Sequence, residues 1–219
     1  MIETPTSQTQ LPDRIAEILA RRIVLGELPP GAKVGQDQIA AEFGASHVPV
    51  REAFRRLEAQ GLLVSLPRRG VRVAPIDPAA VREVTEMRAS LEALALGHAA
   101  RSFSEEDAEA AEQALKDAEA STDLVVWEEA NRRFHRALIA PCGMPRLLSA
   151  IDDLHQALAR FVLAGWKNSD WPRSDDEHRL LLEKMQARDA DGAAGLLVSH
   201  ILSAGRALAD KLEENQLSR

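Results

Sequence analysis

The histidines of this sequence are the side chains whose placement best suits ligand chemistry. The chain contains six of them. Helical spacing turns His178 and His200 toward the apolar faces of two segments and places His135 at the edge of the apolar face of a third. Asn131 precedes His135 by four residues. A buried imidazole needs partners for its ring nitrogens, so each histidine is either a core residue with its own hydrogen bonds or a ligand of one shared cation. Nitrogen ligands with one oxygen suit Zn²⁺, Ni²⁺ or Mn²⁺.

An arginine on an apolar face is a second candidate for binding. Arg88 lies on the apolar side of its segment, and Glu92 follows it by one helical turn. The arginine therefore either pairs with Glu92 within the helix or binds the carboxylate of a small organic acid, since a cation that faces the interior needs an anion. Of the remaining histidines, His155 is placed where it can line a cavity, and His98 is expected to be structural.

Arginine is concentrated in one stretch of an otherwise acidic chain. Residues 46–74 contain six arginines and two glutamates, although the whole chain has a formal net charge of −7. On the helix predicted to begin after Ser46, the apolar side chains gather on one side. About a third of a turn away lies a second group of side chains, which comprises His47, Val48, Arg51 and Arg55. Arginine matches the O6 and N7 atoms of guanine and also binds phosphates, so this surface is predicted to bind DNA. The residues expected to contact DNA are Ser46, His47, Val48, Arg51, Arg55, Arg68, Arg69 and Gly70.

The elements around this stretch follow the order of a winged helix–turn–helix. Residues 11–25 have helical periodicity that ends at Gly26, and a short second helix follows. A third helix runs to about Gln60, with Ser46 as its N-cap. Two short β-type runs then flank a Pro-Arg-Arg-Gly turn, which predicts a hairpin.

From residue 77 onward the sequence contains helical patterns and no β-type alternation. The predicted helices cover about 77–101, 105–120, 123–140, 144–165, 174–188 and 190–215. Helices of this number and length suit a compact bundle. We therefore predict a mainly α fold, with a flexible tail at 1–10, a winged helix–turn–helix at 11–75 and an all-helical bundle at 76–219.

The net charge changes sign at the same boundary, from positive before it to negative after it. Residues 1–75 contain 10 Lys and Arg against 8 Asp and Glu, whereas residues 76–219 contain 17 against 26, which suggests that the two parts have different partners. No apolar run approaches the roughly 20 residues of a membrane span, and the N-terminus lacks the pattern of a secretory signal. The single cysteine, Cys142, cannot form an internal disulfide. We expect a cytoplasmic protein that does not bind membranes.

The run PVREAFRRLEAQGLL, which begins at Pro49, resembles the DNA-binding domain of the GntR family of bacterial transcription regulators. The rest of the chain resembles the all-helical C-terminal domain (FCD type) of the FadR-like branch, and the resemblance covers about residues 11–214. His47 stands where the family usually has arginine, and Asp37 stands at a position that is often basic. We expect the first departure to alter which base is read and the second to remove a phosphate contact. The DNA-contacting positions that the resemblance implies are Ser46, Val48, Arg51, Arg69 and Gly70.

For the helical domain the same resemblance implies a metal site and an effector. Metal-binding members of the branch use an Asp or Asn, a histidine four residues later and two further histidines. Asn131 carries no charge, so we expect weaker metal binding than with an aspartate. The resemblance favours a small carboxylate as effector, bound by Arg88, and a homodimer on a near-palindromic operator whose repression the acid relieves. The positions that match the metal site are Asn131, His135, His178 and His200.

Two other functions would use some of the same residues. A metal-dependent enzyme acting on a small carboxylate would need a general base. Glu177 lies about 100° away from the face of His178, and the sequence indicates no base beside Cys142. A nucleoid-type protein that coats DNA would not carry a large acidic domain, because that domain would repel neighbouring duplex. A ligand-responsive DNA-binding regulator is therefore the favoured interpretation.

Overall fold

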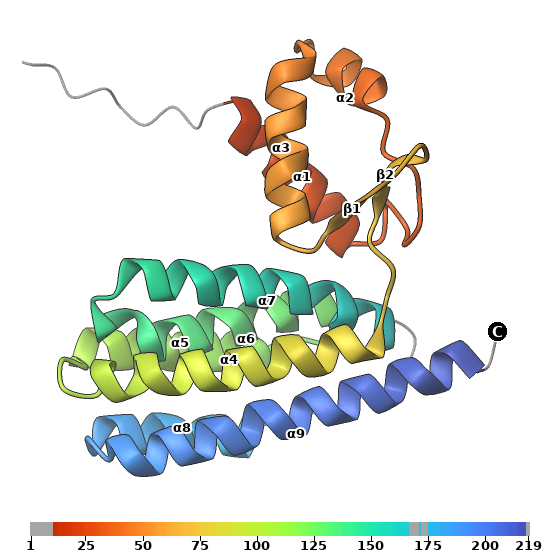
Figure 1. Ribbon diagram of the computed structural model, residues 1–219. Helices are drawn as coiled ribbons and strands as arrows, with labels where there is room; N and C mark the ends of the chain where they lie inside the picture. The colour runs from red at the N-terminus through yellow and green to blue at the C-terminus, as the bar shows by residue number, and fades with distance from the viewer. Residues whose placement is uncertain (1–10, 167–170, 172–174, 218–219) are drawn as a thin grey trace, which may run out of the picture. The chain divides into compact units, whose positions relative to one another are not determined.

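The computed structural model describes residues 11–166, 171 and 175–217. The chain divides into two compact units, Met1–Pro75 and Ile76–Arg219 (Figure 1). The predicted tail at 1–10 and the predicted helix start at 174 lie outside the described residues.

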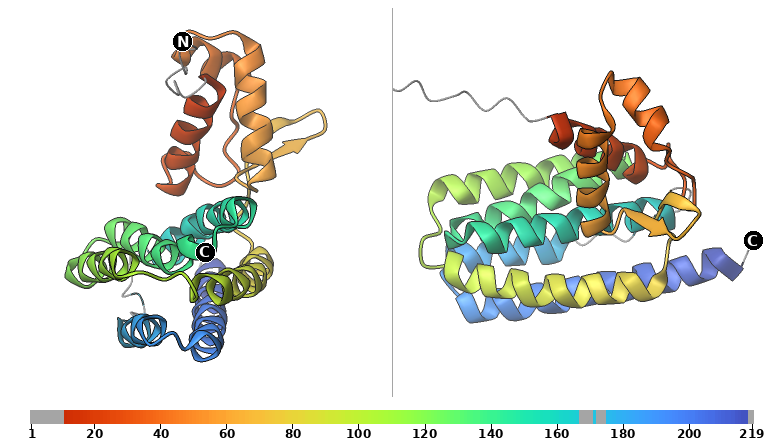
Figure 2. Two further views of the ribbon diagram at one scale, coloured as in Figure 1. Left: turned by 90° about the vertical axis from the view of Figure 1, so that its left-hand side faces the viewer. Right: turned by 45° about the horizontal axis from the view of Figure 1, so that its top comes forward.

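The N-terminal unit is a winged helix–turn–helix, as predicted. It contains α1 (Leu11–Val24), α2 (Gln36–Phe43) and α3 (His47–Ala59). The wing is the antiparallel pair of β1 (Leu63–Leu66) and β2 (Gly70–Val73), with Leu66 opposite Gly70. The hairpin protrudes beside α3 in the left view of Figure 2.

One side of α3 anchors the N-terminal core, which leaves the other side outside. Val50, Ala53, Phe54 and Leu57 are buried among the apolar residues of α1 and the wing, so the predicted apolar face is confirmed. Ser46 occupies the N-cap position, but its side chain makes no capping hydrogen bond. The predicted N-cap position is therefore confirmed, although the Ser46 hydroxyl does not contribute a hydrogen bond to it.

The C-terminal unit is a bundle of helices. α4 and α9 lie side by side in all three ribbon views, and α5 packs on α6 (Figures 1 and 2). A short 3₁₀ helix, Ala140–Cys142, follows α6 within the predicted break between two helices. The helices are α4 (Pro78–Ala99), α5 (Glu105–Ala120), α6 (Leu124–Ile139), α7 (Pro145–Trp166), α8 (Asp175–Gln186) and α9 (Ala190–Leu217).

By length and composition alone, α9 could cross a membrane, which the sequence analysis did not anticipate. The core helix of a bundle passes the same test, since it also presents apolar residues over many turns. Leu197, Ile201 and Leu208 of α9 are buried in the bundle core. Packing inside this unit therefore accounts for the apolar character of α9.

Gly205 allows α9 to approach α4 closely. A Cβ atom at Gly205 would lie 2.2 Å from Cγ2 of Thr85. We expect Gly205→Ala to lower the free energy of unfolding by about 1–3 kcal/mol, because the two helices must separate. At Gly195 of the same helix, a Cβ atom would meet no other element of the described chain within 4 Å. Gly195→Ala should therefore raise the free energy of unfolding by roughly 0.5–1 kcal/mol, and equal effects of the two substitutions in urea denaturation would contradict this packing.

Candidate functional site

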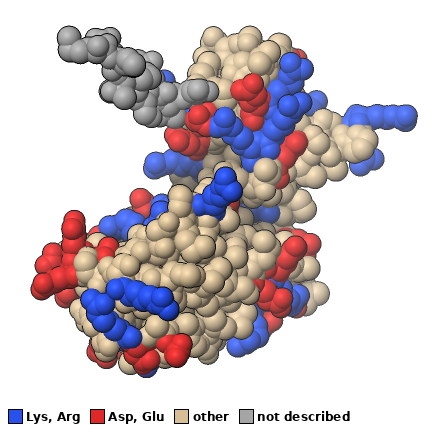
Figure 3. Space-filling model, turned by 60° about the vertical axis from the view of Figure 1, so that its left-hand side comes forward, with Lys and Arg blue, Asp and Glu red and all other residues tan. Residues whose placement is uncertain are grey.

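The outward side of α3 and the tip of the wing carry the residues that the sequence analysis predicts to contact DNA. Basic side chains gather on one side of the N-terminal unit and on its protruding hairpin (Figure 3). Val48 is 54% exposed although it is apolar, so it is available to contact another molecule. All eight predicted DNA-binding residues are exposed: Ser46, His47, Val48, Arg51, Arg55, Arg68, Arg69 and Gly70.

Two of the three arginines of α3 are not engaged by nearby carboxylates, whereas Arg56 forms an ion pair with Asp13. Within the described part of the chain, no ion pair or side-chain hydrogen bond involves Arg51 or Arg55. Glu58, considered as a possible partner, instead accepts a hydrogen bond of 2.6 Å from the hydroxyl of Ser65. The guanidinium groups of Arg51 and Arg55 are therefore available to bases or phosphates.

The two positions that depart from the GntR pattern lie close together. Nδ1 of His47 is 3.7 Å from Oδ1 of Asp37, and both side chains are exposed. The histidine begins α3, whereas the aspartate lies in the first turn of α2. The acidic side chain thus lies beside an imidazole at the N-terminal end of α3.

Three buried histidines converge in the helical unit. His135 comes from α6, His178 from α8 and His200 from α9, and each is at most 5% exposed. One nitrogen of each ring lies within 4.8 Å of the corresponding nitrogen of the others. Nε2 of His178 is 3.1 Å from Nε2 of His200, and two ligands of one metal ion at about 2.1 Å each would be about 3.0–3.4 Å apart. This geometry can hold a divalent metal ion.

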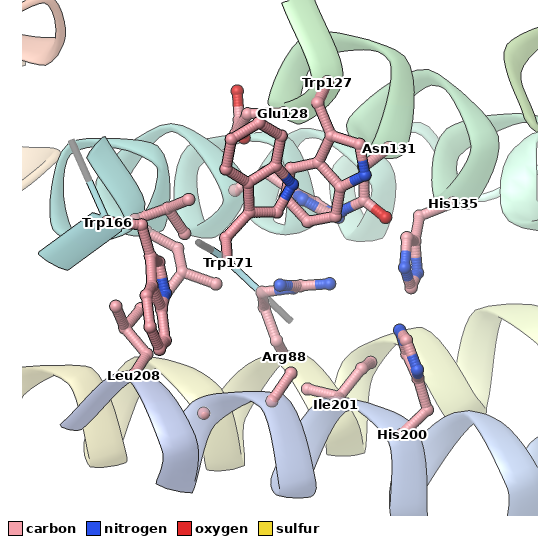
Figure 4. A pocket seen from close by; sticks show the side chains of 15 residues that line it. Arg88, Trp127, Glu128, Asn131, His135, Trp166, Trp171, His200, Ile201 and Leu208 are labelled. Carbon is pink, nitrogen blue, oxygen red and sulfur yellow. The ribbon is translucent and has the colours of Figure 1, made fainter. Parts of the chain in front are cut away.

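Two further atoms at this cluster lack the partners that buried polar atoms require. Nε2 of His135 and Oδ1 of Asn131 are shielded from water, and neither has a hydrogen-bond partner among the residues that the structure describes. The oxygen of Asn131 points toward the ring of His135, and the rings of His135 and His200 face each other (Figure 4). Because an unsatisfied buried polar atom is costly, the donor set fits a bound cation.

Two carboxylates orient the outer nitrogens of these rings. Oε2 of Glu92 lies 2.9 Å from Nδ1 of His135, and Oε2 of Glu177 lies 2.7 Å from Nδ1 of His200. An Nδ1–H donated to a carboxylate leaves the Nε2 lone pair for a metal ion. Sequence reasoning considered Glu177 only as a base beside His178. Its role at His200 was missed because the partner comes from another helix.

Burial keeps the imidazoles of the cluster neutral. It lowers the pKa of His135 to about 4 and the pKa of His178 well below its ordinary value. Burial also lowers the pKa of His200, against the opposing effect of Glu177. Metal ions bind only the unprotonated nitrogen, so these shifts keep the ligands ready at neutral pH.

Glu92 also connects the cluster to Arg88. Nε of Arg88 donates a hydrogen bond of 2.7 Å to Oε1 of Glu92, so the predicted pair within α4 is present. Nε2 of His155 is 3.0 Å from the same oxygen. Burial opposes ionisation of Glu92, but Arg88 and the two histidines hold its pKa well below the ordinary range. His98 is exposed in the last turn of α4.

Arg88 also lines a cavity of about 80 Å³ beside the histidine cluster. A single water needs roughly 10–15 Å³ by the same measure, so the cavity has room for a small organic molecule. His135, His155 and His200 line one part of it, and Trp127, Trp166 and Trp171 line another (Figure 4). Sequence reasoning placed Trp127 on the inner face of its helix but missed the other two tryptophans, because they lie at or beyond the end of α7.

Glu177→Gln tests the role of the outer carboxylate. We expect metal affinity to fall about 10- to 100-fold, because a neutral amide orients the ring of His200 less strongly. Glu183 is an exposed glutamate of the same helix, and Glu183→Gln should leave metal affinity unchanged. Competition with a chromogenic chelator measures the metal affinity of both variants. Equal affinities of the two variants would remove Glu177 from the site.

Two family models match the chain. The model described as "Bacterial regulatory proteins, gntR family" matches residues 11–73, and the FCD domain model matches residues 83–203. The first match covers the winged helix–turn–helix. The second covers Arg88 and the four predicted metal ligands.

Curated relatives resemble nearly the whole chain. The probable D-xylose utilization operon transcriptional repressor of Paenarthrobacter nicotinovorans is 30% identical over 89% of this chain and 87% of its own length. The galactonate operon transcriptional repressor of Escherichia coli (strain K12) is 27% identical over 90% of this chain and 96% of its own length.

Solved structures agree with this relationship. A GntR-family transcriptional regulator from Pseudomonas syringae pv. tomato str. DC3000 is 29% identical, with a TM-score of 0.59, over 99% of this chain and 91% of its own. E. coli McbR/YncC shares the fold, with a TM-score of 0.78 at 22% identity over 94% of this chain and 100% of its own. The chain therefore belongs to the GntR family of bacterial transcription regulators and carries an FCD domain.

Proposed function

We propose that this chain is a homodimeric repressor that leaves its operator when a small organic acid binds beside a metal ion. The observation that carries the proposal is the pairing of two features in one chain. An exposed helix presents Arg51 and Arg55, which form no ion pair within the described residues, and a separate unit contains a buried histidine cluster next to Arg88 in a cavity. The first feature suits DNA, and the second suits an effector.

On DNA, α3 would lie in the major groove with its N-terminal residues toward the bases. Arg51 and Arg55 then read guanine or bind phosphates, and Ser46, His47 and Val48 lie at the leading end of the helix. Arg68, Arg69 and Gly70 at the wing tip contact the backbone or the adjacent minor groove. Two such domains in a dimer match a near-palindromic operator in the bacterial cytoplasm.

In the helical unit, Asn131, His135, His178 and His200 would hold Zn²⁺, Ni²⁺ or Mn²⁺. The bound ion supplies a positive centre that attracts a carboxylate. Arg88 provides a second positive group, and its Nε bond to Glu92 leaves the rest of the guanidinium for an anion in the cavity. A small carboxylate is therefore the class of effector that fits.

The acid can change DNA affinity only if it binds the two states of the dimer unequally. A coupling of 1–3 kcal/mol is typical and changes operator affinity roughly 5- to 150-fold. We expect release because the named relatives are repressors. The enzyme alternative is not supported, since the family and the relatives are transcription regulators. Glu177 is also engaged with His200.

Fluorescence anisotropy on DNA from around the protein's own gene tests the proposal. The metal-loaded protein should bind one fragment selectively over an unrelated competitor, and its affinity should fall steeply as salt rises, because phosphate contacts release counterions. If no fragment is preferred, a genomic pulldown extends the search to the whole chromosome. Absence of selective sites in the pulldown would contradict the proposed function.

A further inference from the structure

Val48 is an apolar side chain that α3 exposes instead of burying. It is the second residue of the helix and is 54% exposed. Among the described residues of the N-terminal unit, the only other exposed large apolar side chain is Leu11, at 41%. The inference below rests on the proposed function, in which α3 lies in the major groove, and it concerns what Val48 recognises there.

Val48 shares one face of α3 with two basic side chains. Arg51 and Arg55 follow it by three and seven positions, and residues at this spacing lie on the same side of an α-helix. Both arginines are exposed and form no ion pair within the described residues. The helix packs on the core through other residues, among them Val50 and Phe54. The face that carries Val48 is therefore the face that the proposed function places against the bases.

The base edges in the major groove offer one methyl group, which is the C5 methyl of thymine. The other groups that distinguish the base pairs there are hydrogen-bond donors and acceptors, and an isopropyl group that covers one of them leaves it without a partner. Contact between the valine and a methyl removes apolar surface of both from water. A β-branched side chain in a helix also has one strongly preferred rotamer, so Val48 loses little freedom on binding. We propose that Val48 is a specificity residue that recognises thymine through its C5 methyl group.

The position of this thymine is linked to the base pair that Arg51 contacts. Cβ atoms three residues apart on a helix are about 5–6 Å apart, and successive nucleotides of a DNA strand rise by about 3.4 Å. The thymine should therefore lie within about two base steps of the base pair whose preference Arg51→Ala relaxes. A dimer places one such thymine in each half-site.

The test replaces thymine with deoxyuridine, which pairs in the same way but lacks the C5 methyl. The operator recovered by selective binding is substituted at one symmetry-related pair of thymines at a time. Anisotropy measures the affinity of the full-length, metal-loaded protein for each duplex. Loss of one buried methyl weakens binding about three- to fivefold, so loss from both half-sites should weaken it about 10- to 25-fold. One pair of thymines, at the expected distance from the Arg51 position, should show this loss.

Two variants assign the effect to a named side chain. Val48→Ala removes both γ-methyl groups, so its preference for thymine over deoxyuridine at this pair should fall to less than about twofold. Leu11→Ala truncates the other exposed apolar side chain of the unit, so it is the matched control and should keep the full preference. Because both side chains are exposed, the melting temperature should not fall in either variant.

A methylated cytosine separates the methyl group from the rest of the thymine base. With cytosine placed at the same pair of positions, 5-methylcytosine should restore about three- to fivefold in affinity per half-site, because it carries the same C5 methyl. Val48→Ala should not distinguish the two cytosines.

Each other outcome has a definite meaning. If deoxyuridine is tolerated at every thymine of a selective operator, the inference is wrong while the DNA-binding function stands. If a sensitive thymine keeps its full effect in Val48→Ala, another side chain recognises it and the assignment to Val48 is wrong. If no DNA is bound selectively, the proposed function fails first and the inference fails with it.

Discussion

His178→Ala is expected to reduce metal affinity by more than about 100-fold, beyond the 10- to 100-fold typical of losing an outer hydrogen-bond partner. His178 is 2% exposed, and its Nε2 lies 3.1 Å from Nε2 of His200. Removal of one imidazole leaves two histidines and one amide, and the amide oxygen carries no charge. The protein should also lose most of its response to the acid, because the positive centre is absent.

Metal content after dialysis and a chelator competition measure this effect. His98→Ala is the matched control, because His98 is an exposed histidine in the same unit. The His178 substitution also leaves a cavity, so His178→Gln provides a second variant of nearly the original volume. Circular dichroism checks that both variants remain helical. Folded His178 variants that bind the metal as tightly as the wild type would remove this histidine from the site.

Arg51→Ala is expected to weaken specific operator binding by about 1–3 kcal/mol, or roughly 5- to 150-fold. The side chain is exposed on α3 and has no ion pair within the described residues. Its loss therefore removes contacts with DNA and leaves the protein core intact. The melting temperature should stay unchanged, which separates a DNA contact from a structural role.

Glu52→Ala alters the neighbouring exposed residue and should not lower operator affinity. Affinity for an unrelated DNA fragment should fall less with Arg51→Ala than affinity for the operator does, because base contacts carry the sequence preference. Anisotropy on both fragments measures the two effects. An unchanged operator affinity would mean that another surface reads the DNA.

Helical periodicity predicted the elements and much of the cluster. It placed His178 and His200 on buried faces, and it placed His135 only at the edge of its face, although this ring is 1% exposed. Periodicity describes one helix at a time, so it cannot show which helices meet. The contacts of Glu92 with His155 and of Glu177 with His200 depend on such meetings.

The type of a residue and its neighbours in the sequence also left some features undetermined. Ser46 has the residue type of an N-cap and occupies that position, but the side chain does not cap the helix. Trp171 lies beyond α7, and its place next to Trp127 follows from the path of the chain rather than from any repeat in the sequence. The contact between Trp127 and Trp171 joins distant segments, which only the folded chain brings together.

The most direct test of the account is acid-dependent release of the operator by the metal-loaded protein. The labelled operator complex is titrated with small carboxylic acids, in parallel with chelator-treated protein and with Arg88→Ala. We predict that at least one acid releases the DNA from the metal-loaded wild type and that both parallel samples respond much more weakly. An operator affinity that no acid changes, or a release equally strong without the metal and without Arg88, would contradict the account.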